Sequence, residues 1–326
     1  MFANVSNDSL PADGLVYPKE EGSVSLDTRY RLSTDFFDSS GNREDTFSDG
    51  SQQRYHDVQF LWELAYGLTD DITFWLEFPI LYRKETRSLN RDDSGFGDVQ
   101  AGVRCRYWET ADKKFEFAFD LSGKFPTGDT DVNFSDPSRG IEEELPMGSG
   151  NSNLTPTLFF KQHLSNRWSL EESAGYTFRF DSIIEFLRTN SVAQTTQDGT
   201  TVVLPVGNLR LDWGDEIDLR ARIGWSATDR LTLSNDVHYF YRRETLIQVI
   251  SLTTDSSGNP GSTRSDLSLR SAYVLFVRPS ISYDILGRLR LRAAVEIPLI
   301  GDSYPSIPLV ESLVGNLYQM ELHYAF

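Results

Sequence analysis

The chain has 326 residues, a formal net charge of -17 and a mean hydropathy of -0.38. The acidic balance argues against a nucleic-acid partner, because phosphate binding needs a basic face. The single cysteine, Cys105, excludes an intrachain disulfide and a zinc site built from several cysteines. No run of eighteen apolar residues occurs, so membrane-spanning helices are excluded.

Residues 1–22 show no strand pattern and contain Pro11, Gly14 and Pro18 among several acids. The start of the chain lacks the basic and apolar regions of a signal peptide, so we expect a mature chain whose leader has been removed. The chain therefore divides into an N-terminal segment, 1–22, and a barrel, 23–326. The segment either enters the barrel as a plug or is disordered in the periplasm.

From residue 23 onward, apolar and polar residues alternate with a period of two, which predicts strands. In one of them Leu289, Leu291 and Ala293 alternate with Arg290 and Arg292. Large apolar residues on one face and several charges on the other are typical of a lipid-facing wall around a polar lumen. Twelve strands are predicted, at 24–36, 54–66, 72–85, 97–108, 114–125, 153–164, 168–181, 213–226, 231–245, 266–284, 288–300 and 316–326.

The connections between these strands alternate between five short ones and six longer ones. Short periplasmic turns and long extracellular loops are the layout of a transmembrane barrel. The fold class is therefore an all-β, antiparallel, up-and-down transmembrane barrel with both termini in the periplasm. Aromatic residues near the predicted strand ends, such as Tyr107, Trp168 and Trp225, are expected to form the periplasmic girdle.

The last strand ends in an aromatic residue, Phe326, on its apolar face. This ending resembles the insertion signal that the outer-membrane assembly machinery reads. We therefore expect the barrel to lie in the bacterial outer membrane, in contact with its lipid and lipopolysaccharide.

One stretch resembles a known family. It reads Gly-Phe-Gly-Asp-Val-Gln-Ala-Gly-Val-Arg-Cys-Arg-Tyr at 95–107, Lys-Phe-Pro-Thr-Gly-Asp at 124–129 and Leu-Pro-Met-Gly-Ser-Gly at 145–150. These motifs are similar to those of an outer-membrane transporter-like family associated with the meta-cleavage pathway of phenol degradation. The resemblance implies a barrel with a transport role and supplies no catalytic residues.

The lumen face of the barrel collects charges of both signs, and these are the candidate site residues. A narrow bore of twelve strands lets such side chains meet across part of it. They form either a salt-bridged filling that closes the barrel or a selectivity lining with an arginine track on one strand. The lining candidates are Arg288, Arg290 and Arg292 of that track, together with Arg220, Arg222, Arg104, Arg106, Glu77, Lys124 and Glu296.

Three upward strands share a Phe-Pro or Ile-Pro pair, at 78–79, 125–126 and 297–298. Proline removes a ladder donor, so these pairs are explained by strands that bend into their loops. The alternative is a constriction ring of Glu77, Lys124 and Glu296 below the extracellular mouth.

The sequence predicts no enzyme, no cofactor and no metal site. The four histidines are scattered, and His56 and Asp57 are adjacent in a strand, so their side chains point to opposite faces. The leading hypothesis is passive or facilitated passage of a small molecule, polar, anionic or aromatic, through the charged lumen. The alternative is a closed barrel that binds a protein partner through acidic extracellular loops at 126–151, 182–212 and 246–264.

Overall fold

A computed structural model describes most of the chain. The described residues are 15–37, 43–45, 54–86, 90–129, 147–148, 150–180, 182–185, 192–195, 201–204, 207–212, 214–254, 260–269, 271–302 and 314–326. Among these residues there is no helix long and apolar enough to cross a membrane.

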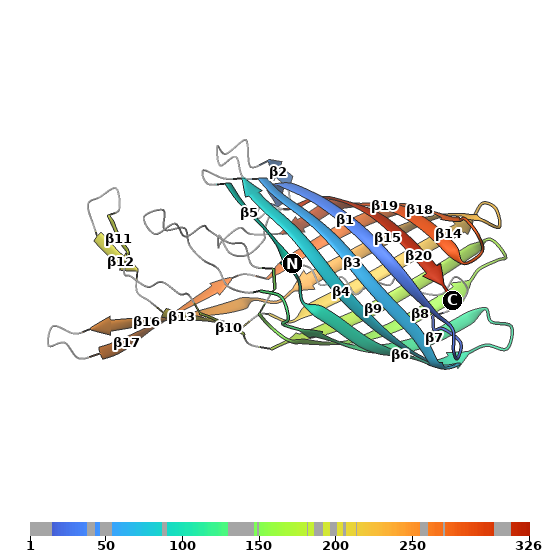
Figure 1. Cartoon of the computed structure of the whole chain (residues 1–326), viewed down its shortest axis with the longest axis horizontal. Helices are drawn as coiled ribbons and strands as arrows, with labels where there is room; N and C mark the ends of the chain where they lie inside the picture. The colour runs from blue at the N-terminus through green and yellow to red at the C-terminus, as the bar shows by residue number, and fades with distance from the viewer. Residues whose placement is uncertain are drawn as a thin grey trace.

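Twelve antiparallel strands close into a barrel, as the sequence predicted (Figure 1). Each strand pairs with the next one along the wall, and the first strand, β1, pairs with both β3 and β20, which closes the ring. The barrel strands are β1 (Gly22–Phe37), β3 (Arg54–Thr69), β4 (Ile72–Thr86), β6 (Val99–Glu109), β7 (Phe115–Phe125), β8 (Asn153–His163), β9 (Trp168–Arg179), β14 (Glu216–Ser226), β15 (Leu231–Arg242), β18 (Ala272–Asp284), β19 (Leu289–Asp302) and β20 (Val314–Ala325).

The period-two alternation of the sequence becomes an inner and an outer face. On β7, Glu116 and Asp120 point inward and are 4% and 0% exposed, whereas Phe119 and Phe125 point outward and are 38% and 52% exposed. The same division holds along the other barrel strands. The inside of the barrel is therefore polar and the outside apolar.

The two ends of the barrel differ. Five short connections, at 70–71, 110–114, 164–167, 227–230 and 285–288, lie at one end, which we call the turn end. In the last of them Gly287 has a φ of +70°, a conformation that glycine adopts without strain. The C-terminal Phe326 also lies there and exchanges backbone hydrogen bonds with Gly22. The opposite end is called the loop end.

The structure adds strands that the sequence analysis did not predict. Two short ones, β2 (Arg43–Asp45) and β5 (Asn90–Phe96), extend the barrel wall at β1 and β4. A separate sheet has the order β10 (Ser182–Glu185), β13 (Gly207–Asp212), β16 (Thr245–Thr254) and β17 (Pro260–Leu269), and β11 (Val192–Thr195) pairs with β12 (Thr201–Leu204). These strands project beyond the loop end (Figure 1).

One predicted strand boundary was wrong. The sequence analysis treated 266–284 as one strand, but the structure divides it between β17 and β18. The alternation continues through the junction, so the pattern could not reveal it. The division arises because β17 pairs with β16 outside the barrel, whereas β18 pairs with β15 and β19 inside its wall.

Candidate functional site

The middle of the lumen is lined by ionisable side chains, many of which are buried. They point inward from many strands, and several are less than 7% exposed, including Asp27, Arg29, Glu77, Asp236 and Arg278. A buried charge is tolerated when it is paired and hydrogen-bonded. Each buried charge in the lumen is therefore expected to have a partner of opposite charge or a hydrogen-bond partner.

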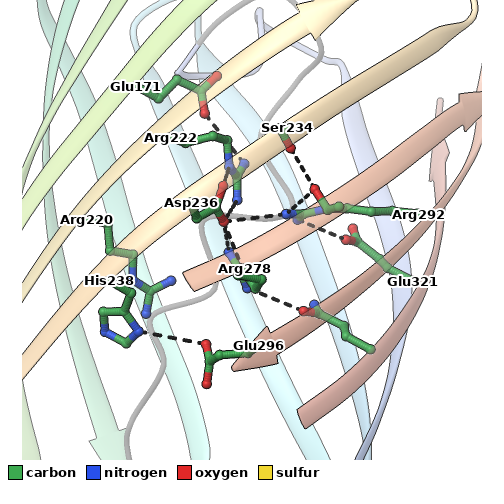
Figure 2. A network of polar contacts seen from close by, with 12 residues as sticks. Glu171, Arg220, Arg222, Ser234, Asp236, His238, Arg278, Arg292, Glu296 and Glu321 are labelled. Carbon is green, nitrogen blue, oxygen red and sulfur yellow. Dashed lines mark hydrogen bonds and ion pairs between the residues drawn. The ribbon is translucent and has the colours of Figure 1, made fainter. Parts of the chain in front are cut away.

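Asp236 of β15 is the centre of the largest network (Figure 2). Arg222 of β14 donates from Nε to Asp236 Oδ1 at 2.7 Å and from Nη2 to Oδ2 at 3.0 Å. Arg278 of β18 donates to Oδ2 from Nε at 2.8 Å and from Nη2 at 2.5 Å. Arg292 Nη2 of β19 lies 3.7 Å from the same oxygen. One carboxylate, 2% exposed, thus holds three guanidinium groups from three strands.

The network extends to both sides of Asp236. On one side Arg222 contacts Glu171 at 3.5 Å, and Glu171 contacts Lys161 at 3.2 Å. On the other side Arg292 contacts Glu321 at 3.8 Å. In addition, Arg278 donates to the side chain of Gln319, which itself donates to Asp27 of β1. Polar contacts therefore link β8, β9, β14, β15, β18, β19, β20 and β1, which ties together the lumen face of most of the wall.

A second cluster lies around His238. Its Nε2 is 2.6 Å from Asp218 Oδ2, and its Nδ1 is 3.8 Å from Glu296 Oε2. Arg220 donates to Asp218 at 3.0 Å, and Arg31 lies 3.9 Å from Glu296. This cluster joins β14, β15, β19 and β1 and lies on the loop side of the Asp236 network.

An apolar cluster follows toward the loop end. Phe240 of β15 and Val274 and Phe276 of β18 point inward and are 2%, 0% and 4% exposed. The ring of Phe276 stacks on His238 with centroids 5.4 Å apart. The lumen therefore changes along this wall from an apolar lining to a charged one.

A vestibule of about 570 Å³ reaches the charged network from the turn end. Its lining is rich in cations although the whole chain is strongly acidic. The cationic lining residues are Lys113, Lys114, Lys161, Arg167, Arg222, Arg290 and Arg292, against the acids Asp112, Glu171 and Glu321. Arg290 is held at the rim by Asp284, whose Oδ1 accepts from its Nε at 2.7 Å.

The N-terminal segment crosses the lumen beside this vestibule. The backbone N–H of Leu15 donates to both carboxylate oxygens of Glu116 at 2.9 Å, and the N–H of Tyr17 donates to Thr73 at 2.7 Å. The Tyr17 hydroxyl lies 2.9 Å from Nε2 of His323 on β20. Leu15 and Tyr17 are 1% and 4% exposed. Residues 15–17 thus contact the inner face of strands on different sides of the barrel; the part of the predicted segment before residue 15 lies outside the described residues.

The predicted lining residues fall into several groups. Arg290, Arg292 and Arg222 line the vestibule, and Arg220 belongs to the His238 cluster. Arg104 pairs with Asp120 at 3.2 Å and lies 4.2 Å from the centre of the Phe159 ring. On the same carboxylate, Trp75 Nε1 donates at 2.8 Å.

Two of the predicted arginines lie at the turn end instead. Arg106 contacts Asp71 of the 70–71 turn at 2.9 Å. Arg288 precedes β19 and is exposed in the 285–288 turn. The arginine track of β19 therefore has two inward members, Arg290 and Arg292, because the strand begins one residue after Arg288.

The three members of the predicted constriction ring have separate partners. Lys124 Nζ lies 3.3 Å from Asp98 and 3.0 Å from Asn151 Oδ1. Glu77 accepts a long hydrogen bond from Gln100, and Glu296 contacts His238 and Arg31. The Phe-Pro and Ile-Pro dipeptides lie where the wall is irregular. Strand β4 changes its partner from β6 to β5 around Pro79, and Pro126 follows the end of β7. On β19, Pro298 lies opposite Phe276 of β18, beside a shift in register.

Asp236 and Arg278, the centre of the network, are not among the predicted lining residues. Alternation gives the face of a residue and leaves unspecified which residues of other strands lie beside it. His56 and Asp57 do point to opposite faces, toward Tyr30 and Arg83 respectively. Most of the acidic loop residues expected to bind a partner lie outside the described residues.

Comparison with known proteins gives the family. A family model described as "Putative MetA-pathway of phenol degradation" matches residues 33–295. No curated protein matches the chain. Among solved structures, an outer-membrane channel from Pseudomonas putida F1 aligns with a TM-score of 0.65 at 13% identity, over 97% of this chain and 99% of the other.

The toluene transporter TodX of Pseudomonas putida aligns with a TM-score of 0.53 at 12% identity, over 99% of this chain and 92% of the other. At these identities the likeness concerns the fold: a closed antiparallel barrel of the kind found in outer-membrane channels. The family match covers most of the chain, including the motifs at 95–107 and 124–129. The chain therefore belongs to the family described as "Putative MetA-pathway of phenol degradation" and has the fold of outer-membrane channels.

Proposed function

We propose that this barrel lies in the bacterial outer membrane, with its turn end in the periplasm, and lets a small molecule pass without coupling to an energy source. The observation that carries the proposal is the closed wall with an apolar outer face and a polar lumen, which suits lipid outside and solute inside. Short turns on the periplasmic side and long loops outside are the usual arrangement of such barrels.

The lining favours a compact solute that combines an apolar body with a polar or anionic group. The buried cluster of Phe240, Val274 and Phe276 makes the loop side of the lumen apolar, and the vestibule has cations such as Arg290 and Arg292 on the turn side. An anionic or hydrogen-bond-accepting group gains from guanidinium donors, whereas an aromatic ring gains from the apolar lining. The relative named as a toluene transporter is consistent with a small aromatic body.

The N-terminal segment forms a constriction at the periplasmic end of the proposed channel. Its backbone is hydrogen-bonded to Glu116 and Thr73, and Tyr17 spans to His323. A segment that is fixed at several points narrows the bore. Together with the Asp236 network it restricts passage to small solutes.

Liposome swelling tests this function. The full chain is reconstituted in liposomes, and swelling is followed with benzoate, benzyl alcohol, benzylammonium and a neutral disaccharide at equal osmolarity. We expect benzoate and benzyl alcohol to enter faster than benzylammonium, and the disaccharide to be excluded. Equal rates for empty liposomes and liposomes with folded barrel, for every solute, would show that the barrel is not a channel for small molecules.

A further inference from the structure

The outer wall carries a groove of about 490 Å³ that spans β6 to β15. Its lining is mostly apolar and includes Phe117, Phe160, Leu219 and Val237. The small side chains of Ala174 and Ala221 leave room between these larger neighbours. A concavity of this size is in the range of ligand sites in general.

The lining residue Arg220 turns its side chain inward to Asp218. Glu172 of β9 is the acidic residue that lines this groove. It is exposed on the outer face, where its neighbours on the adjacent strands are Phe160 of β8 and Ala221 of β14. Within the part of the chain that the structure describes, its carboxylate has no hydrogen-bond or ion-pair partner. The other charged side chains on the outer face of the described strands, Lys84, Asp92 and Asp302, lie near the loop end.

The position of Glu172 along β9 gives its depth. It lies four residues from Trp168, the first residue of the strand at the turn end. At about 3.3 Å per residue and a strand tilt of about 40°, it sits roughly 10 Å above the periplasmic end of the wall. That position is inside the apolar band, where an ionisable side chain is unfavourable unless it has a partner and therefore marks a functional site.

We propose that this groove binds a phospholipid with an ethanolamine headgroup from the periplasmic leaflet, its ammonium pairing with Glu172 and an acyl chain lying along the apolar lining. This inference rests on the membrane placement proposed above and concerns a site outside the channel. Charge complementarity selects the ammonium, because the groove holds a carboxylate with no partner. The lower end of the groove, at Tyr107 and Phe117, lies two residues from the turn-end limit of β6 and β7, close to the expected headgroup level.

A second copy of the barrel fits the groove less well than a lipid does. A two-fold contact through the groove would place one Glu172 opposite the other, and the outer face near this depth offers no cation among the described residues. Like charges facing each other across an interface are unfavourable. A lipid ammonium avoids this repulsion and keeps its flexible stem near the interface.

Native mass spectrometry of the full chain tests the proposal. The barrel is exchanged into mixed micelles with equal amounts of phosphatidylethanolamine and phosphatidylglycerol, and retained lipid is counted. We expect one retained phosphatidylethanolamine, preferred at least tenfold over phosphatidylglycerol. Glu172→Gln is expected to reduce that preference about tenfold, which equals roughly 1.4 kcal/mol, because the neutral amide keeps the size of the side chain and loses the charge.

Asn235 provides a matched control. It is a polar residue on the outer face of β15, also four residues from the turn-end start of its strand, and lies outside the groove. Asn235→Ala should leave lipid retention unchanged, whereas Ala221→Phe, which fills the groove, should reduce retention of both lipids. All variants are first checked for folding by their heat-modifiable gel mobility.

The proposal is overturned if the wild type shows no preference between the two lipids, or if Glu172→Gln retains phosphatidylethanolamine as well as the wild type does. A dimer that disappears in Glu172→Gln would assign the groove to a second copy and would also overturn it. Liposome swelling stays a separate readout, because loss of the lipid site leaves the lumen lining intact. A failure of the lipid experiment with normal swelling therefore refutes this inference and leaves the channel function in place.

Discussion

Replacing Asp236 by Asn tests the account of the lumen most sharply. The substitution keeps the shape of the side chain and removes the negative charge that three guanidinium groups share. Arg222 and Arg278 each donate two hydrogen bonds to it, and Arg292 lies 3.7 Å away. Asn can accept at one oxygen only, and its NH₂ group would face a guanidinium group.

The expected loss of stability follows from the burial of the two partners. The side chain of Asp236 is 2% exposed, and that of Arg278 is 5% exposed, so both lie away from screening solvent. Removing one partner of a buried ion pair costs about 3–5 kcal/mol, because the remaining charge stays buried without compensation. We expect the free energy of unfolding of Asp236→Asn to fall by this amount. Asp284→Asn is the matched control: its partner Arg290 is bound at 2.7 Å, but both side chains are about 30% exposed, so roughly 0.2–1 kcal/mol is expected.

The assay is reversible denaturant unfolding of the barrel in lipid vesicles, followed by tryptophan fluorescence. In the Asp236→Asn background, Arg278→Met should recover part of the loss, because it removes one of the buried charges left without a partner. The reasoning is refuted if Asp236→Asn costs no more than Asp284→Asn, since the buried network would then contribute no more than a half-exposed pair at the rim.

Three further predictions address the N-terminal segment, the vestibule and a turn. Deleting residues 1–18 should increase single-channel conductance several-fold, because residues 15–17 no longer cross the lumen; an unchanged conductance would show that they do not obstruct it. Arg290→Glu should shift the reversal potential toward cations in a salt gradient, and an unshifted value would remove the vestibule from the permeation path. In the 110–114 turn, hydrogen bonds from Lys114 and Thr110 lower the pKa of Asp112 to about 2. The Asp112–Lys114 pair should therefore persist as the pH falls through the usual carboxyl range and be lost only near pH 2. An Asp112 titration measured by NMR that is the same in Lys114→Met would contradict this.

The sequence alone predicted much of the barrel. Alternation predicted the twelve wall strands and the face of each residue, because every residue of a wall strand faces either the polar lumen or the apolar surroundings of the barrel. It also placed Arg222, Arg290 and Arg292 inside, where they line the vestibule. Arg288 was assigned to the lumen because the alternation continues through it, although β19 starts at Leu289.

Contacts between distant strands were beyond the sequence pattern. Asp236 meets Arg292 only because β15, β18 and β19 are neighbours in the closed wall with a particular register. Residues 15–17 carry no periodic pattern, and their position depends on backbone donors that any residue possesses. The strand β16 and most of β17 were assigned to a loop, because adjacent apolar residues such as Leu246 and Ile247 break the period of two, and their sheet with β13 depends on pairings that the pattern does not specify.

The most direct test of the central claim is single-channel conductance of the full chain in a planar bilayer, with reversal potentials in a salt gradient. We expect a small, steady conductance, because the Asp236 network and residues 15–17 narrow the lumen, and a preference for anions, because the vestibule is cationic. Folded barrels that insert and carry no current under either polarity, or that prefer cations, would contradict it.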